Sequence, residues 1–169
     1  SANIAPDRAV GRLVAALPAG TLVVFTSVHG DMHGAHGLFR KGWPHEESVR
    51  VPLLIAGGRQ PAGGGRIDDR AISLLDLEKL TMVLAGLGEP GTEPVGAAIS
   101  MPSVVRLPDQ GDRIWHGLRT RTRKLVLNAD GTPWLFFDLE RDPGELVNLA
   151  AEPARAGEMA ELRRILPTR

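Results

Sequence analysis

Cysteine is absent from this chain of 169 residues. Its absence excludes disulfides, thiolate metal sites and any nucleophile made from a cysteine within these residues. Charge of one sign is also not in excess, because 20 basic residues balance 20 acidic ones for a formal net charge of zero. The composition therefore gives no electrostatic reason to expect binding to nucleic acid or to an anionic membrane.

Long apolar runs are missing as well. No run approaches the roughly 18 residues that a membrane span needs, and no signal peptide is visible. The chain opens on Ser1 rather than on methionine, so the absence of a leader gives no information about the compartment. The sequence also leaves the oligomeric state open. Hydrophobic residues make up 43% of the chain, which is enough for a core in one domain or in one lobe of a larger protein.

The first half of the chain has the pattern of an α/β protein. Residues 5–17 have the apolar spacing of an amphipathic helix, and the run at 21–26 predicts a strand buried on both faces, as inside a parallel sheet. A helix that leads at once into a buried strand resembles half of a βαβ unit, so we expect the unit's first strand to lie before Ser1. A second buried strand is expected at 51–56, followed by a helix after the capping sequence Ser73–Asp76.

The last third of the chain changes to the pattern of antiparallel hairpins. Short strands are predicted around a turn at Ala129–Gly131, and a final amphipathic helix is predicted at 153–166. The strands are expected at 115–120, 123–128 and 134–138. Basic residues between 119 and 124 follow the alternation of a strand, which favours a solvated face over an anion-binding patch.

A polar loop separates the two buried strands and contains four of the five histidines. They are His29, His33, His36 and His45. A polar loop at the end of a buried strand is where α/β enzymes commonly place their chemistry. Taken alone, the loop is compatible with a transition-metal site, but also with histidines that only shape the loop.

Four stretches of the sequence, in this order, resemble the C-terminal part of the type I sulfatases in the alkaline-phosphatase superfamily. They are GTLVVFTSVHGDMHGAHGLFRKGWPHEESVRVPLLI, SLLDLEKLTMVLAGLG, LRTRTRKLVLN and LFFDLERDPGELVNLA. The resemblance implies the α/β sulfatase fold, with the end of a largely parallel sheet and its helices followed by a small antiparallel sheet and a C-terminal helix. We therefore expect a division into the α/β core at 1–108 and the smaller subdomain at 109–169.

The resemblance also assigns roles within the polar loop. His29 stands at the second position of the family's metal-binding pair, and Lys41 stands where the family has a lysine that binds a sulfate oxygen. The family's usual metal is Ca²⁺, with Mg²⁺ or Mn²⁺ as alternatives. Val28 occupies the position of the metal-binding aspartate and offers no lone pair, so we expect metal binding to be weakened or absent. Asp31 belongs to the family's ordinary Gly-Asp and is not expected to substitute.

The family's nucleophile is a formylglycine made within a Cys/Ser-x-Pro-Ser-Arg motif, and this chain has no such motif. The nearest dipeptide, Pro102-Ser103, lacks both the nucleophile and the arginine. The resemblance thus implies part of a metal-dependent sulfuric ester hydrolase for small-molecule sulfate esters, and we expect this chain alone not to turn over. The alternatives are a non-catalytic sulfatase-like domain, a phosphonate or phosphate-ester hydrolase of the same superfamily, or an unrelated α/β binding module.

The remaining polar residues of the loop have structural interpretations. We expect His33 and His45 to lie on the surface or at the rim of the site, and His36 to shape the loop or line the pocket. The acidic pair and the arginine that follow are expected to form ion pairs rather than to catalyse. These three residues are Glu46, Glu47 and Arg50.

Overall fold

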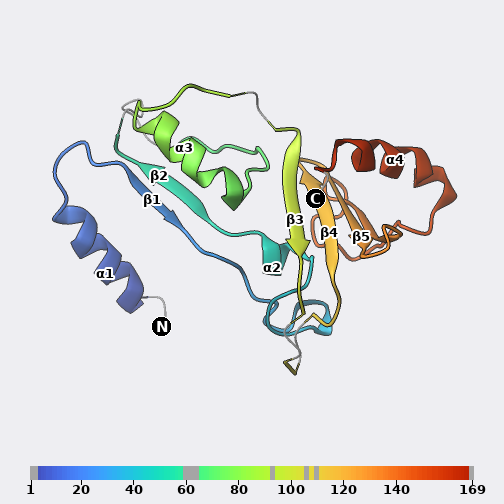
Figure 1. The fold of residues 1–169 in the computed structure, drawn as a ribbon. Coiled ribbons are helices and arrows are strands. Elements are labelled where there is room, and N and C mark those ends of the chain that lie inside the picture. The colour runs from blue at the N-terminus through green and yellow to red at the C-terminus, as the bar shows by residue number, and fades with distance from the viewer. Residues whose placement is uncertain (1–3, 59–64, 92–93, 105–106, 109–110, 168–169) are drawn as a thin grey trace. The chain divides into compact units, whose positions relative to one another are not determined.

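The computed structural model describes residues 4–58, 65–91, 94–104, 107–108 and 111–167, which fall into two compact units (Figure 1). The first unit comprises Ser1–Thr26, Pro52–Arg66 and Leu77–Gly91. The second unit comprises Ser27–Val51, Ile67–Asp76 and Thr92–Arg169. The polar loop and the antiparallel sheet therefore belong to the same unit.

The first unit contains the two predicted apolar strands and two helices. Its elements are α1 (Ile4–Ala15), β1 (Val23–Thr26), β2 (Leu53–Ala56) and α3 (Leu77–Leu84). The helices and strands lie within two or three residues of the predicted bounds. The short 3-10 turn η2 (Leu74–Asp76) precedes α3 in sequence and carries the predicted capping aspartate.

β1 and β2 pair antiparallel, with Thr26 opposite Leu53. The parallel arrangement predicted for this part of the chain is therefore wrong for these two strands. An apolar run carries no information about strand direction. The predicted burial on both faces is also wrong for the described structure, because Phe25 of β1 is 44% exposed and Leu54 of β2 is 63% exposed. Sheets that are otherwise parallel commonly include an antiparallel strand. The pairing makes residues 27–52 the long connection of a hairpin.

The second unit is built on a four-stranded antiparallel sheet in the order β3-β4-β5-β6. The strands are β3 (Gly96–Met101), β4 (Trp115–Thr120), β5 (Arg123–Asn128) and β6 (Pro133–Asp138). The last three confirm the predicted strands. β3 was not predicted, because Gly96-Ala-Ala has few of the branched or aromatic side chains that mark a strand. The boundary at residue 108 stays a prediction, although β3 precedes it and pairs with β4.

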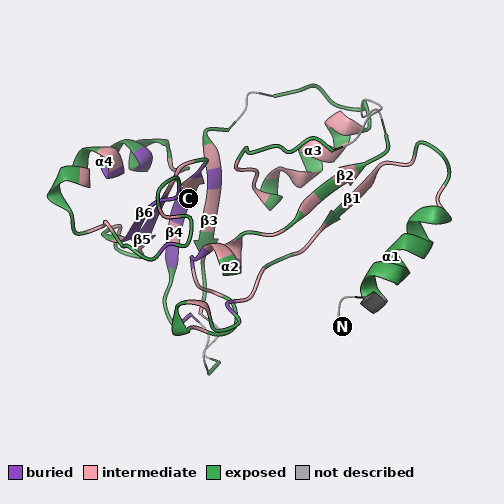
Figure 2. Ribbon diagram, turned by 180° about the vertical axis from the view of Figure 1, so that it is seen from behind, coloured by how far each residue is buried: buried purple, intermediate pink, exposed green. Residues whose placement is uncertain are grey.

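In the sheet of the second unit, β4, β5 and β6 are largely buried, as their purple colour in Figure 2 shows, whereas most residues of β3 are only partly buried. One face packs against α4 (Ala156–Ile165), which follows the 3-10 turn η3 (Pro153–Arg155). The cluster on that face consists of Leu118, Leu125, Leu127, Phe136, Met159 and Leu162. The opposite face buries Trp115, Val126, Leu135, Phe137 and Leu139, with Val49 of the short helix α2 (Glu46–Val49) packed against them. The polar loop is thus attached to the sheet by its own apolar residue.

These elements confirm the expected fold class of helices, a small antiparallel sheet and a C-terminal helix. Across the described stretches, every helix is too short and too polar to cross a bilayer.

Candidate functional site

The connection between β1 and β2 folds back on itself through backbone hydrogen bonds. The Met32 amide donates to the Arg40 carbonyl, and the Gly34 amide donates to the Leu38 carbonyl, both at 2.9 Å. Gly34 has a φ of 95°, in the left-handed region that glycine enters without steric cost. These bonds reverse the chain and bring the two arms of the loop side by side.

The reversal brings His29 and Lys41 into contact. The Lys41 Nζ lies 3.0 Å from the His29 Nε2. On the other side of the ring, the His29 Nδ1 lies 2.8 Å from the Gly30 carbonyl oxygen, which can only accept. Nδ1 therefore carries the proton and donates to Gly30, so the lone pair on Nε2 accepts a hydrogen bond from the Lys41 ammonium.

Gly30, directly after His29, lies against the helix α2. Its amide donates to the Ser48 carbonyl at 2.9 Å. A Cβ at this position would lie 1.9 Å from the Glu47 carbonyl oxygen, which no real contact allows. The chemistry of the loop therefore depends on glycine at this position, and α2 fixes the backbone that carries His29.

Val28, the neighbour of His29, is 83% exposed and has no donor atom. The nearest carboxylate in the sequence does not replace it, because Asp31 Oδ1 accepts the His33 amide at 3.0 Å and pairs with the His33 ring. The His33 side chain is 86% exposed, which confirms its predicted surface position. At the position that the resemblance assigns to a metal ion, Val28 thus offers no ligand atom and His29 offers one imidazole nitrogen.

A buried lysine lies beneath the loop, on β5. Lys124 has no exposed surface, and its Nζ lies 2.5 Å from Glu145 Oε1, 2.7 Å from Glu46 Oε1 and 3.0 Å from the Pro44 carbonyl oxygen. Arg119 also pairs with Glu46, at 3.1 Å. The prediction of a solvated basic face is wrong for Lys124, because both faces of the sheet are covered. The predicted ion-pair role of Glu46 is confirmed.

The two carboxylates around Lys124 differ in their pKa. Burial raises the pKa of Glu145, and Lys124 offsets only part of that effect. Burial also acts against ionisation of Glu46, but Lys124 and Arg119 together hold the pKa of Glu46 below its usual value. The difference follows from the number of cations, since Glu46 contacts two and Glu145 contacts one. We call Lys124, Glu46, Glu145 and Arg119 the ion-pair core.

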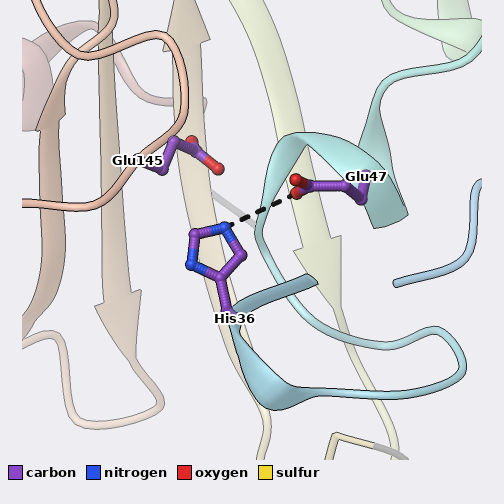
Figure 3. A group of neighbouring side chains, drawn as sticks. All are labelled: His36, Glu47 and Glu145. Atoms are coloured by element: carbon purple, nitrogen blue, oxygen red, sulfur yellow. Dashed lines mark ion pairs between the residues drawn. The ribbon is translucent and has the colours of Figure 1, made fainter. Parts of the chain in front are cut away.

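His36, Glu47 and Glu145 form a group next to the ion-pair core (Figure 3), and each has a possible ligand atom within 4.8 Å of the others. The His36 Nε2 lies 3.7 Å from Glu47 Oε2, which is an ion pair when His36 is protonated. The Lys124 ammonium already lies 2.5 Å from Glu145 Oε1, so it would repel a divalent cation bound to Glu145. We therefore assign this group to the stabilisation of the loop and not to a metal site.

His45 is buried beneath the loop, with 9% of its surface exposed. Its ring lies 4.3 Å from the ring of His36 and 6.0 Å from that of Phe137, measured between centroids. Its Nδ1 finds no hydrogen-bond partner among the residues that the structure describes. Burial, reinforced by the nearby His36 and Lys124, lowers the pKa of His45 to about 4. The predicted surface position of His45 is wrong, because the loop folds its first helical turn against the sheet.

The structure thus brings together the two residues predicted for the site, His29 and Lys41, with Val28 beside them. Sequence reasoning missed the residues that hold this arrangement from the sheet. These residues are Trp115, Lys124 and Glu145. Their only sequence signal is a charged or aromatic residue in a short strand or turn, which is equally typical of a surface.

No protein-family model matches the chain, but curated relatives do. An arylsulfatase of Clostridium perfringens (strain 13 / Type A) is 30% identical over 182 aligned residues, which cover 95% of this chain and 37% of the relative. A choline-sulfatase of Rhizobium meliloti (strain 1021) is 31% identical over 172 residues, covering 92% of this chain and 33% of the relative. The chain belongs to the sulfatase family.

Solved structures show the same fold for this sulfatase chain. BT1596, a 2-O GAG sulfatase, superposes with a TM-score of 0.75 at 22% identity, over 94% of this chain and 38% of its own. The phosphonate monoester hydrolase of Agrobacterium radiobacter gives a TM-score of 0.65 at 27% identity, over 85% of this chain and 34% of its own. The chain spans about a third of the length of the curated sulfatases it matches.

Proposed function

We propose that this chain supplies the Lys41 edge of a sulfate-ester site in a sulfuric ester hydrolase. In this proposal, the Lys41 ammonium binds a sulfate oxygen and His29 orients the ammonium. The complete protein would act on a small-molecule sulfate ester. Hydrolysis also needs a nucleophile, and the chain contains neither cysteine nor the motif that would supply a formylglycine. As this chain alone it binds but does not turn over.

The contact between Lys41 and His29 is the observation that carries the proposal. An ammonium has three donor hydrogens, and the Nε2 of His29 takes one of them at 3.0 Å. Two remain to donate to the oxygens of an anion. A lysine ammonium is a compact positive charge with several donors, which suits the oxygens of a sulfate or a sulfate ester.

Val28 and His29 do not fit the calcium ion that the family resemblance implies. Ca²⁺ takes six to eight oxygen ligands. Val28 has no ligand atom to offer, and the lone pair of the His29 Nε2 is bonded to Lys41. A metal ion at His29 would have to displace Lys41 and would lack the carboxylate that Val28 replaces. We therefore assign no step of the chemistry to a metal held by this chain.

Two other functions have a specific observation in their favour. Val28 favours a non-catalytic sulfatase-like domain that binds sulfate esters without hydrolysing them. The similarity to a phosphonate monoester hydrolase favours a phosphorus ester as the substrate of the complete protein. The nucleophile of the complete protein would distinguish a sulfate-ester hydrolase from a phosphate-ester hydrolase. A formylglycine motif indicates sulfate esters, and a bare threonine or serine indicates phosphate esters.

Replacing Lys41 with methionine is expected to weaken the binding of inorganic sulfate roughly tenfold or more, because a hydrogen bond to a charged group contributes about 1.5–3 kcal/mol. The measurement is an NMR titration of the 169-residue chain with sodium sulfate, following the His29 ring signals. Lys79→Met, on the exposed face of α3, is the matched control and is expected to leave the affinity unchanged. An equal sulfate affinity for Lys41→Met and the unsubstituted chain would refute the proposed role.

A further inference from the structure

We propose that Trp115 and the ion-pair core are positioning residues of the sulfate site, and that the antiparallel sheet holds Lys41 and His29 in register through them. This inference deepens the function proposed above and rests on it. It assigns to the second half of the chain a role in the site, although none of its residues touches the Lys41 ammonium in any contact that the structure describes.

Three backbone carbonyls of the Lys41 arm accept hydrogen bonds from residues of the sheet or of the loop that leads into it. The Gly111 amide donates to the Lys41 carbonyl at 3.4 Å, and the Trp115 indole N–H donates to the Gly42 carbonyl at 2.8 Å. Further on, the Lys124 ammonium donates to the Pro44 carbonyl at 3.0 Å. Lys41 thus lies at one end of a segment that is fixed along its whole length.

The segment ends in α2, whose first residue is held from two sides. The Glu46 amide donates to Glu145 Oε2 at 2.8 Å, while the Glu46 carboxylate pairs with Lys124 at 2.7 Å and with Arg119 at 3.1 Å. In the same helix, the Ser48 carbonyl accepts a hydrogen bond from the Gly30 amide. One rigid connection therefore runs from the sheet to Lys41 on one arm of the loop and to His29 on the other.

A substitution at Trp115 can distinguish a role in positioning Lys41 from a role in general stability. The Trp115 side chain is 2% exposed and contributes to the apolar cluster of the sheet, and its indole N–H donates to the Gly42 carbonyl of the loop. Trp115→Phe keeps most of the packing and removes that donor. The Gly42 carbonyl, next to Lys41, then loses its anchor.

A substitution at Gly111 should displace the Lys41 arm, whereas Trp115→Phe only releases it. A Cβ there would lie 2.5 Å from the Gly42 carbonyl oxygen and 2.8 Å from the carbonyl carbon, so Gly111→Ala must push the Lys41 arm away. A variant that loosens the arm and a variant that displaces it should both disturb the contact between Lys41 and His29. Trp134→Phe is the matched control, because Trp134 lies in β6 and packs against the guanidinium of Arg113 rather than the loop.

The test measures the ¹⁵N signal of His29 Nε2 and the affinity for inorganic sulfate in the unsubstituted chain and in the three variants. We expect Trp115→Phe and Gly111→Ala to change the Nε2 signal and to weaken sulfate binding roughly tenfold, the effect of about 1.4 kcal/mol. Trp134→Phe should leave both unchanged at a similar loss of thermal stability. Lys41→Met gives the reference spectrum for a broken contact.

The outcomes separate this inference from the proposed function. If Lys41→Met abolishes sulfate binding while neither Trp115→Phe nor Gly111→Ala moves the Nε2 signal, the positioning role is wrong and the proposed function stands. If Lys41→Met leaves sulfate binding unchanged, the proposed function fails, and the Nε2 signal alone still decides whether the sheet positions the pair. A change of equal size in Trp134→Phe would reduce the effect to general stability and overturn the inference.

Discussion

Replacing Lys124 with methionine is expected to cost about 3–5 kcal/mol of the free energy of unfolding, the usual loss when one partner of a buried ion pair is removed. Methionine fills a similar volume, so the loss comes from charge and not from a cavity. Glu145 would keep no cation within ion-pair distance in the described structure, and Glu46 would keep only Arg119. Urea denaturation followed by tryptophan fluorescence measures the effect.

The fluorescence reports the right unit, because all three tryptophans of the chain, Trp43, Trp115 and Trp134, lie in the second unit. Arg121→Met is the matched control, since Arg121 is exposed in the turn before β5 and should change stability by less than about 0.5 kcal/mol. Adding Glu145→Gln to Lys124→Met should recover part of the lost stability, because it removes the buried carboxylate that has no cation beside it. A loss below about 1 kcal/mol for Lys124→Met would contradict the ion-pair core as we describe it.

His45 is expected to make the second unit lose about 3 kcal/mol of stability between about pH 6.5 and pH 4. The pKa of His45 is lowered from 6.5 to about 4 in the folded chain, so the unfolded state binds a proton first as the pH falls. The stabilising contribution of the neutral ring is therefore complete above the unfolded pKa and is lost as the pH falls through the folded one. Because the ring is buried, little of this effect is screened by solvent.

The measurement is urea denaturation at about pH 7 and about pH 4.5, compared between the unsubstituted chain and His45→Phe. Phenylalanine keeps the ring beside His36 and Phe137 but cannot take up a proton, so the variant should show the smaller fall in stability. His33→Phe is the control, because it makes the same replacement at an exposed position. An equal pH dependence in His45→Phe would show that His45 takes up its proton at the same pH in the folded and the unfolded chain, which contradicts a lowered pKa.

Most of the second unit was predictable because its signals are local. The turn at Ala129–Gly131 contains a glycine with a φ of 82°, and the strands on either side of it alternate as hairpins do. β3 was not predicted because its small residues have little preference for strands. The antiparallel pairing of β1 and β2 escaped for another reason, since strand direction depends on the path of the intervening loop and not on the residues of the strands.

The two residues of the candidate site could be singled out from the sequence, but the residues that support them could not. The resemblance to the sulfatase loop singled out His29 and Lys41, which lie 3.0 Å apart in the structure, and their roles in binding stay predictions. The burial of Lys124 and His45 was not predictable, because it depends on partners far away in the sequence. Lys124 and Pro44 are 80 residues apart, and Glu46 and Glu145 are 99 apart. No local pattern indicates which charged residue such partners will cover.

We propose that Val28 stands in place of a metal-binding carboxylate of the sulfatase family, and that Lys41 and His29 therefore pair with each other and do not face a metal ion. The most direct test is a calorimetric titration of the full-length gene product with calcium chloride, with Val28 in place and as Val28→Asp. We predict weak or no binding with Val28, and binding tighter by at least about 100-fold in Val28→Asp, since even losses outside the ligand shell cost 10–100-fold. Calcium binding at about 10⁻⁶ M or tighter with Val28 in place, and no gain from Val28→Asp, would contradict the claim.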